Sequence, residues 1–151
     1  MSATPTHQAS CFCGAVKMTL SGEPEAMAYC HCDSCRHWSA SQVSAFTLWK
    51  PAALSIDGGA ERIASFEQNP RSDHADVVSR RKWCSVCGGH LYTDHPTMGL
   101  VDVPSAVIDK FQFEPAFHVH YQESVQPIRD GLPKFRDLPK EAGGTGEQLA
   151  E

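Results

Sequence analysis

The 151-residue sequence has no long hydrophobic run and no excess of positive charge. No stretch approaches the roughly 18 consecutive apolar residues that a membrane-spanning helix needs, so we expect none. Thirteen lysine and arginine residues against eighteen aspartate and glutamate residues give a formal net charge of −5. Because a net-negative chain is not attracted to nucleic acids or anionic membranes, neither is an expected partner.

The first ten residues also lack the basic and apolar segments of a secretory signal peptide. We therefore expect a cytoplasmic protein. In that reducing compartment, clustered cysteines are more often metal ligands or redox groups than disulfides.

Long helices are not expected either, because ten prolines and eleven glycines interrupt the chain. Short stretches with apolar residues in alternation, or rich in strand-forming residues, predict strands instead. Six such segments are predicted, at residues 16–20, 42–49, 76–83, 91–93, 99–103 and 117–121. One short helix is predicted after Cys32, through Arg36 and Trp38. The pattern indicates one mainly β domain with short antiparallel strands.

Cysteine is what the sequence does have, with seven in three clusters. The clusters are Cys11 and Cys13; Cys30, Cys32 and Cys35; and Cys84 and Cys87. Buried structural cysteines have no reason to gather in this way, whereas a metal ion needs several thiolates at about 2.3 Å. An odd count also leaves one thiol unpaired in any scheme of disulfides only. We infer metal binding, with zinc favoured and an iron–sulfur cluster as the alternative.

The flanking residues indicate which cysteines share an ion. Cys13 and Cys87 are each followed directly by a glycine, which suits the positive φ of a tight turn around a thiolate. Two such turns from distant parts of the chain predict a closed four-cysteine site of Cys11, Cys13, Cys84 and Cys87. Three thiolates then remain, at Cys30, Cys32 and Cys35.

Three protein ligands with an open fourth position are typical of a catalytic zinc site. The alternative is a histidine that closes the second site. His37 is the nearest candidate in the sequence, while the side chain of His31 is expected to point away from the ion. His118 and His120 share one face of a predicted strand and are further candidates.

The ordered motifs C-x-C-G, C-H-C-x-x-C-R and W-C-x-x-C-G-G resemble those of the glutathione-dependent formaldehyde-activating enzyme family. The resemblance extends to Gly58 followed by Phe66 and to Phe117-His118-Val119. It implies an Mss4-like fold of short antiparallel sheets around a structural zinc. It covers a zinc domain at residues 9–140, which leaves an extension at 1–8 and a tail at 141–151 that is expected to be flexible because it has little apolar content.

The resemblance implies two zinc ions and the same division of the cysteines. Cys11, Cys13, Cys84 and Cys87 match the structural ligands, and Cys30, Cys32 and Cys35 match the catalytic site. The implied activity is that of a carbon–sulfur lyase, which adds a small thiol, glutathione by resemblance, to formaldehyde or a related aldehyde. Three thiolates suit this chemistry, because they make zinc a poor activator of water but leave room for a substrate thiol.

A proton donor and a carboxylate-binding group are also expected for such a reaction. The candidate donors are His31, His37, His74, His95 and His118, and Arg36 is the candidate for holding a substrate carboxylate. A competing interpretation is a non-catalytic, zinc-stabilised Mss4-like binding or scaffold module. A thiol redox enzyme of this fold needs a reactive cysteine apart from the metal ligands, and no cysteine follows Cys87.

Overall fold

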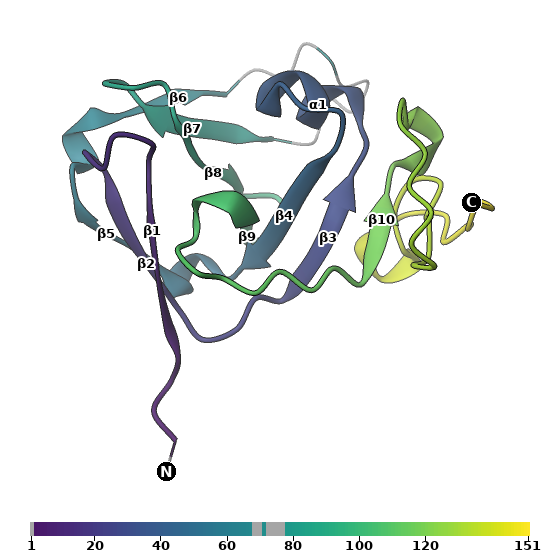
Figure 1. Cartoon of the computed structure of the whole chain (residues 1–151), viewed down its shortest axis with the longest axis horizontal. Coiled ribbons are helices and arrows are strands. Elements are labelled where there is room, and N and C mark those ends of the chain that lie inside the picture. Colours follow the sequence, from purple (N-terminus) through teal and green to yellow (C-terminus); the bar gives the residue numbers. More distant parts are fainter. Residues whose placement is uncertain (1, 68–70, 72–77) are drawn as a thin grey trace. The chain divides into compact units, whose positions relative to one another are not determined.

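The computed structural model describes all residues except 1, 68–70 and 72–77. The chain forms two compact units (Figure 1), one of residues 1–25 and 47–112 and the other of residues 26–46 and 113–151. Within the described residues, short strands predominate and α1 (Asp33–Ser39) is the one α-helix. The mainly β class expected from the sequence is confirmed.

The first unit contains antiparallel sheets. In one sheet, β2 (Lys17–Ser21) lies between β1 (Thr6–Ser10) and β5 (Leu54–Gly58). A second run of strands has the order β9-β8-β7-β6. These strands are β6 (Ile63–Phe66), β7 (Arg80–Cys84), β8 (His90–His95) and β9 (Leu100–Pro104).

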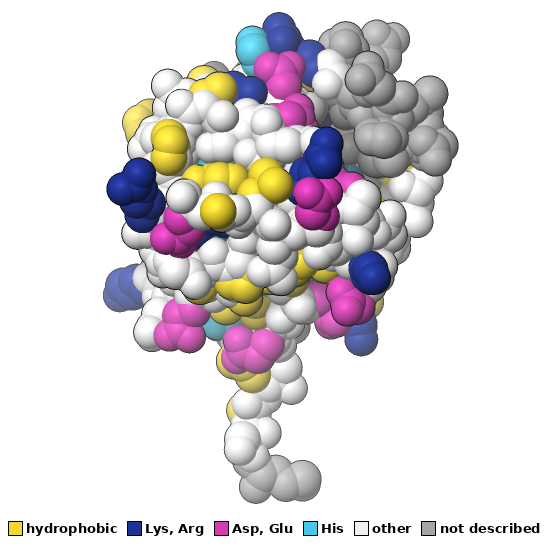
Figure 2. Space-filling model, turned by 90° about the vertical axis from the view of Figure 1, so that its right-hand side faces the viewer, with side chains coloured by type: hydrophobic (Ala, Val, Ile, Leu, Met, Phe, Trp, Pro, Cys, Tyr) yellow, Lys and Arg dark blue, Asp and Glu magenta, His cyan; other side chains and the backbone are white. Residues whose placement is uncertain are grey.

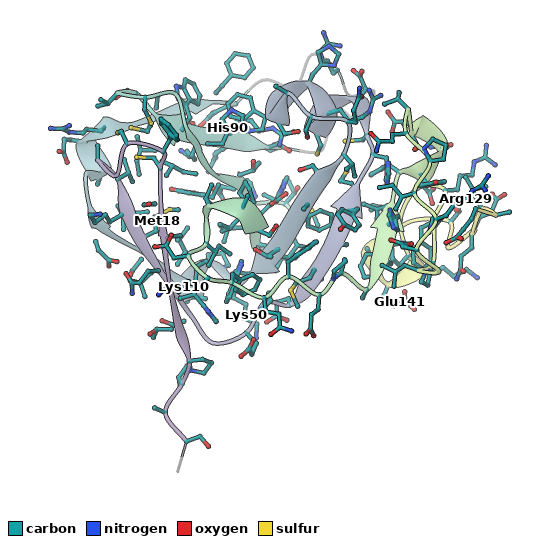
Figure 3. All side chains as sticks on the ribbon, in the orientation of Figure 1. Met18, Lys50, His90, Lys110, Arg129 and Glu141 are labelled. Atoms are coloured by element: carbon teal, nitrogen blue, oxygen red, sulfur yellow. The ribbon has the colours of Figure 1, made fainter. Side chains whose placement is uncertain are left out.

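The alternation that predicted a strand near residue 18 places one face of β2 in the core. Met18, labelled in Figure 3, and Leu20 are fully buried, whereas Lys17 and Ser21 are exposed. The apolar cluster of this unit also includes Ala9, Cys11, Val16, Trp49, Cys84, Leu91, Val101, Val103 and Ile108. The unit buries Thr47, Ser79, Arg81 and Thr93 as well. The first unit is therefore held by ordinary hydrophobic packing.

The second unit has a different core. Its strand β3 (Ala26–Cys30) pairs with β10 (Phe117–Val119), and this pairing is parallel, unlike the antiparallel strands expected. On its other side, β10 exchanges hydrogen bonds between His118 and residues 133 and 135. The next strand in sequence, β4 (Ser44–Trp49), leads from the second unit into the first. Parallel strands need a long connection, which here runs from residue 31 to residue 116 and includes residues 47–112 of the first unit.

Five short 3-10 helices complete the described secondary structure. They are η1 (Pro51–Ala53), η2 (Ala60–Arg62), η3 (Ser105–Val107), η4 (Tyr121–Glu123) and η5 (Lys140–Ala142). The predicted strand at 117–121 ends at Val119, because His120 has a φ of 53° and turns the chain into η4. Of the predicted strand at 76–83, residues 76–77 lie outside the described residues, and the strand begins at Arg80.

The expected domain boundaries remain predictions. Residues of the expected tail make defined contacts: the Leu149 amide donates to the Lys134 carbonyl, and the Arg136 amide donates to the Glu147 carbonyl. No helix of the described chain is long and apolar enough to cross a membrane. Acidic and basic side chains are interspersed on the face shown in Figure 2.

Truncation of a buried core residue tests the packing of the first unit. Leu20→Ala should lower the free energy of unfolding by about 2–5 kcal/mol, because the cavity adds to the lost transfer free energy. The control is Met98→Ala in the same unit, whose side chain is 47 % exposed and whose loss should cost about 0.5 kcal/mol or less. Urea denaturation of both variants measures the difference, and equal losses would contradict the assigned core.

Candidate metal centres

The first unit brings four cysteine sulfurs together, those of Cys11, Cys13, Cys84 and Cys87. The Sγ atoms of Cys11 and Cys13 are 3.7 Å apart, and those of Cys13 and Cys84 are 3.9 Å apart. Zinc–sulfur bonds of about 2.3 Å in a regular tetrahedron place the sulfurs about 3.8 Å apart. The described distances therefore fit a tetrahedral zinc ion and are much too long for a disulfide.

Two tight turns present these sulfurs. Gly14 and Gly88 have φ values of 78° and 75°, so the glycines after Cys13 and Cys87 do adopt the left-handed conformation expected. The amide of Gly14 donates to the Cys11 carbonyl. The matching bond in the other turn runs from the Gly88 amide to the carbonyl of Cys84. The turns are thus fixed by local sequence, while strand pairing brings them together.

Backbone amides also point at the sulfurs of this group. The Val16 amide donates to Cys11 Sγ and the Gly89 amide to Cys87 Sγ, both at 3.3 Å. The bond from Gly89 lowers the pKa of Cys87 to about 6, so the thiolate form is favoured at neutral pH. The thiolate is the form that binds a metal ion.

The second unit gathers the other three sulfurs, whose ligand atoms all lie within 4.8 Å of one another. Cys30 ends β3, Cys32 is the N-cap of α1, and Cys35 lies in the first turn of that helix. The Cys35 amide donates to Cys32 Sγ at 3.3 Å. Cys30 is buried, whereas Cys32 and Cys35 are half-buried, so the group is reachable from one side.

Hydrogen bonds among these thiols favour one thiolate. Bonds from Cys30 and Cys35 lower the pKa of Cys32 to about 3. The same interactions raise the pKa of Cys30 well above its ordinary value. The group is therefore prepared to hold a cation, since a cation removes the repulsion that opposes a second and third thiolate.

Among the described residues, no histidine joins the three sulfurs as a fourth ligand. The side chain of His31 contacts His118 instead, with 2.8 Å between His31 Nε2 and His118 Nδ1. His37 Nδ1 lies 3.2 Å from Asp33, and His120 Nδ1 lies 3.7 Å from Glu123. The described part of the chain thus offers three ligand atoms at this site.

The remaining residues expected to donate a proton or to bind a substrate carboxylate make other contacts where the structure describes them. His74 lies outside the described residues, and His95 belongs to the first unit, where it contacts Ser79. Arg36 is used internally: its Nε donates to the carbonyl oxygen of His31 at 2.9 Å. Its guanidinium also lies 3.8 Å from Asp33, so Arg36 braces the cysteine loop.

No sequence pattern indicated the polar residues that contact His118. His118 Nε2 lies 2.8 Å from Asp130 Oδ2, and Lys134 Nζ donates to Asp130 Oδ1 and to Glu151 Oε1, each at 2.7 Å. Burial opposes the charge of Lys134, but these two hydrogen bonds raise its pKa above the ordinary value. Burial lowers the pKa of His31 to about 4, so this imidazole is neutral near pH 7.

Serine variants should separate the two metal centres. Cys84→Ser removes a ligand that closes the first unit, and we expect loss of one zinc equivalent and of more than about 4 kcal/mol of stability. Cys32→Ser should also lose one zinc equivalent but stay folded, because serine keeps the N-cap of α1. Elemental analysis and urea denaturation measure both effects. Equal destabilisation by the two variants would contradict the division into a structural and an open site.

A curated protein and a solved structure are each similar to this chain over more than half of its length. An uncharacterized lyase of Schizosaccharomyces pombe is 28 % identical over 88 residues, which cover 58 % of this chain and 57 % of that protein. The chain thus matches little more than half the length of this relative. A crystal structure of a Rhodobacter sphaeroides protein aligns with a TM-score of 0.54 and 18 % identity, over 70 % of this chain and 90 % of that one. This likeness supports the expected Mss4-like fold.

The family comparison covers the cysteine clusters of both units. The sequence model described as "Glutathione-dependent formaldehyde-activating enzyme" matches residues 6–123. This range includes all seven cysteines and both groups of sulfurs described above. The chain belongs to the family of glutathione-dependent formaldehyde-activating enzymes.

Proposed function

We propose that the protein is a zinc-dependent enzyme of the carbon–sulfur lyase type. It adds a small thiol, glutathione in view of the family, to formaldehyde or a related aldehyde, and it acts in the cytoplasm. The observation that supports this proposal is the three-cysteine group, to which the described residues add no fourth ligand atom.

The reaction joins the two substrates without a redox change. The thiol sulfur forms a bond to the carbonyl carbon, and the π electrons of the C=O bond move to oxygen. The proton lost by the thiol ends on that oxygen, which gives a hemithioacetal with one hydroxyl group. In the lyase direction the carbon–sulfur bond breaks, and the same proton returns to sulfur.

The residues around the three-cysteine group position its sulfurs for this reaction. Zinc, when held by Cys30, Cys32 and Cys35, supplies an open position at which a substrate thiol is held in its thiolate form. The α1 N-cap fixes Cys32 and Cys35, and the bond from Arg36 to the carbonyl of His31 fixes the loop before the helix. Burial of Cys30 keeps water from one side of the sulfurs. Preorganisation of this kind lowers the entropic cost of bringing the reactants together.

Known relatives support the same reaction class. The family is described as formaldehyde-activating, and the Schizosaccharomyces pombe relative is named a lyase. Because the match spans only 57 % of that relative, the identity of the thiol and of the aldehyde is part of the proposal.

A binding module is the second candidate function. Phe12 and Val86 are 93 % and 59 % exposed, and each lies in one of the two tight turns of the four-cysteine group. Exposed apolar side chains at rigid turns are suited to contact with another protein. In this case loss of Cys32 would change no activity.

Exchange spectroscopy tests the proposed enzyme. Zinc-loaded protein should accelerate the exchange between glutathione, formaldehyde and their hemithioacetal, observed by NMR at several pH values. Cys32→Ser should reduce the acceleration by at least about 100-fold, because the open metal position is lost. Rates in the presence of the protein that equal those in buffer would refute the proposed activity. A fully active Cys32→Ser protein would instead show that the reaction does not depend on the three-cysteine group.

A further inference from the structure

The second unit buries a series of polar side chains in contact with one another, to which the proposed reaction assigns no role. His31 and His118 are fully buried, and Lys134 is 1 % exposed. Asp130, whose side chain is 28 % exposed, joins His118 to Lys134, and His31 contacts His118. Apolar residues of similar size would fill this space at a lower cost of desolvation, so packing alone does not account for the arrangement.

The hydrogen bonds in this series have a defined direction. Oδ1 of Asp130 accepts from Lys134 Nζ and from the amide of Leu132, at 2.7 and 3.1 Å. Oδ2 of the same carboxylate faces His118 Nε2 at 2.8 Å. Although burial raises it, the bonds from Lys134 and His118 hold the pKa of Asp130 well below its usual range. An ionised carboxylate can only accept, so His118 carries a hydrogen on Nε2.

The hydrogen on His118 Nε2 also determines which ring donates in the contact between His118 and His31. With its hydrogen on Nε2, a neutral His118 has a lone pair on Nδ1. With His118 in this neutral form, the neighbouring His31 Nε2, at 2.8 Å, donates to it. His31 Nδ1 is left as the acceptor nitrogen of its ring.

That acceptor has no partner among the described residues, although it is buried from solvent. Buried polar atoms without a hydrogen bond are rare and costly in folded proteins. His31 stands between Cys30 and Cys32 in the chain, so the unpaired nitrogen belongs to the loop that holds the three-cysteine group. Both observations point to a hydrogen-bond donor that arrives with a ligand of this group.

We propose that Asp130 and His118 are positioning residues that hold His31 in one tautomer, so that His31 Nδ1 accepts a hydrogen bond from the substrate hydroxyl. This inference rests on the proposed function, because that hydroxyl is the one formed in hemithioacetal synthesis. An acceptor at this hydroxyl raises the electron density on its oxygen, which favours departure of sulfur in the lyase direction. The acceptor is lost if the tautomer of His31 is reversed.

The substitution Asp130→Asn is designed to reverse the tautomer of His31. The amide oxygen should stay where Oδ1 is, because two donors, Lys134 Nζ and the Leu132 amide, meet there. The amide NH₂ then faces His118 Nε2 and donates to it. His118 must carry its hydrogen on Nδ1 and donate to His31, whose own hydrogen moves to Nδ1. A matched control is Glu141→Gln, the same loss of charge at an exposed residue of the same unit (Figure 3).

Long-range proton–nitrogen NMR of the histidine rings measures the tautomers directly in the zinc-loaded protein. In the wild type and in Glu141→Gln, His31 should carry its hydrogen on Nε2, and in Asp130→Asn on Nδ1. Glutathione and formaldehyde together should shift the Nδ1 resonance of His31 in the wild type only. The kcat of Asp130→Asn should fall by about 100-fold or more, with unchanged zinc content, as expected for a wrong tautomer.

The outcomes separate this inference from the proposed function. A wild-type His31 with its hydrogen on Nδ1, or an Nδ1 resonance that substrates leave unchanged in an active enzyme, would overturn the inference and leave the enzyme proposal standing. The same holds if Asp130→Asn keeps full activity. A wild-type protein without thiol–aldehyde activity would refute the proposed function, and with it the assigned role of Nδ1. The wild-type spectrum decides the tautomer even if Asp130→Asn fails to fold.

Discussion

The convergence of cysteine sulfurs at distances that match a tetrahedral metal ion is the constraint on which the rest of the structure depends. The Cys13 and Cys84 sulfurs are 3.9 Å apart although 71 positions separate them in the sequence. A metal ion there would close a long loop and stabilise the ends of strands that come from distant parts of the sequence of the first unit. The apolar core of that unit, with Trp49 and Leu91 fully buried, is built beside the same cysteines.

The two units differ in the side chains that they bury beside their cysteine groups. The first packs its apolar cluster against the four-sulfur group and also buries Thr47, Ser79, Arg81 and Thr93. The second buries two histidines and a lysine behind a three-sulfur group and keeps two of its cysteines half-buried. Such a polar interior costs stability, and residues that cost stability are most readily explained by chemistry. We therefore propose that the reaction takes place in the second unit.

Much of this was predictable from local sequence. The glycines after Cys13 and Cys87 predicted the two turns, the alternation around Met18 predicted β2, and helix α1 was expected after Cys32. Long-range pairing was not predictable. The parallel pairing of β3 with β10 leaves no mark in either short segment, and His31 meets His118 across 87 positions of sequence. Asp130 precedes Gly131, a pair typical of a turn, and its contact with His118 depends on that pairing.

The central claim is that one metal position is closed by four protein sulfurs and the other is open to a thiol. Cadmium NMR of the cadmium-substituted protein tests it most directly, since the cadmium resonance reports the number of sulfur ligands at each site. We expect two resonances, of which one stays fixed and the other moves toward the four-sulfur position when glutathione is added. A single resonance, or two resonances that are both unaffected by the thiol, would contradict it.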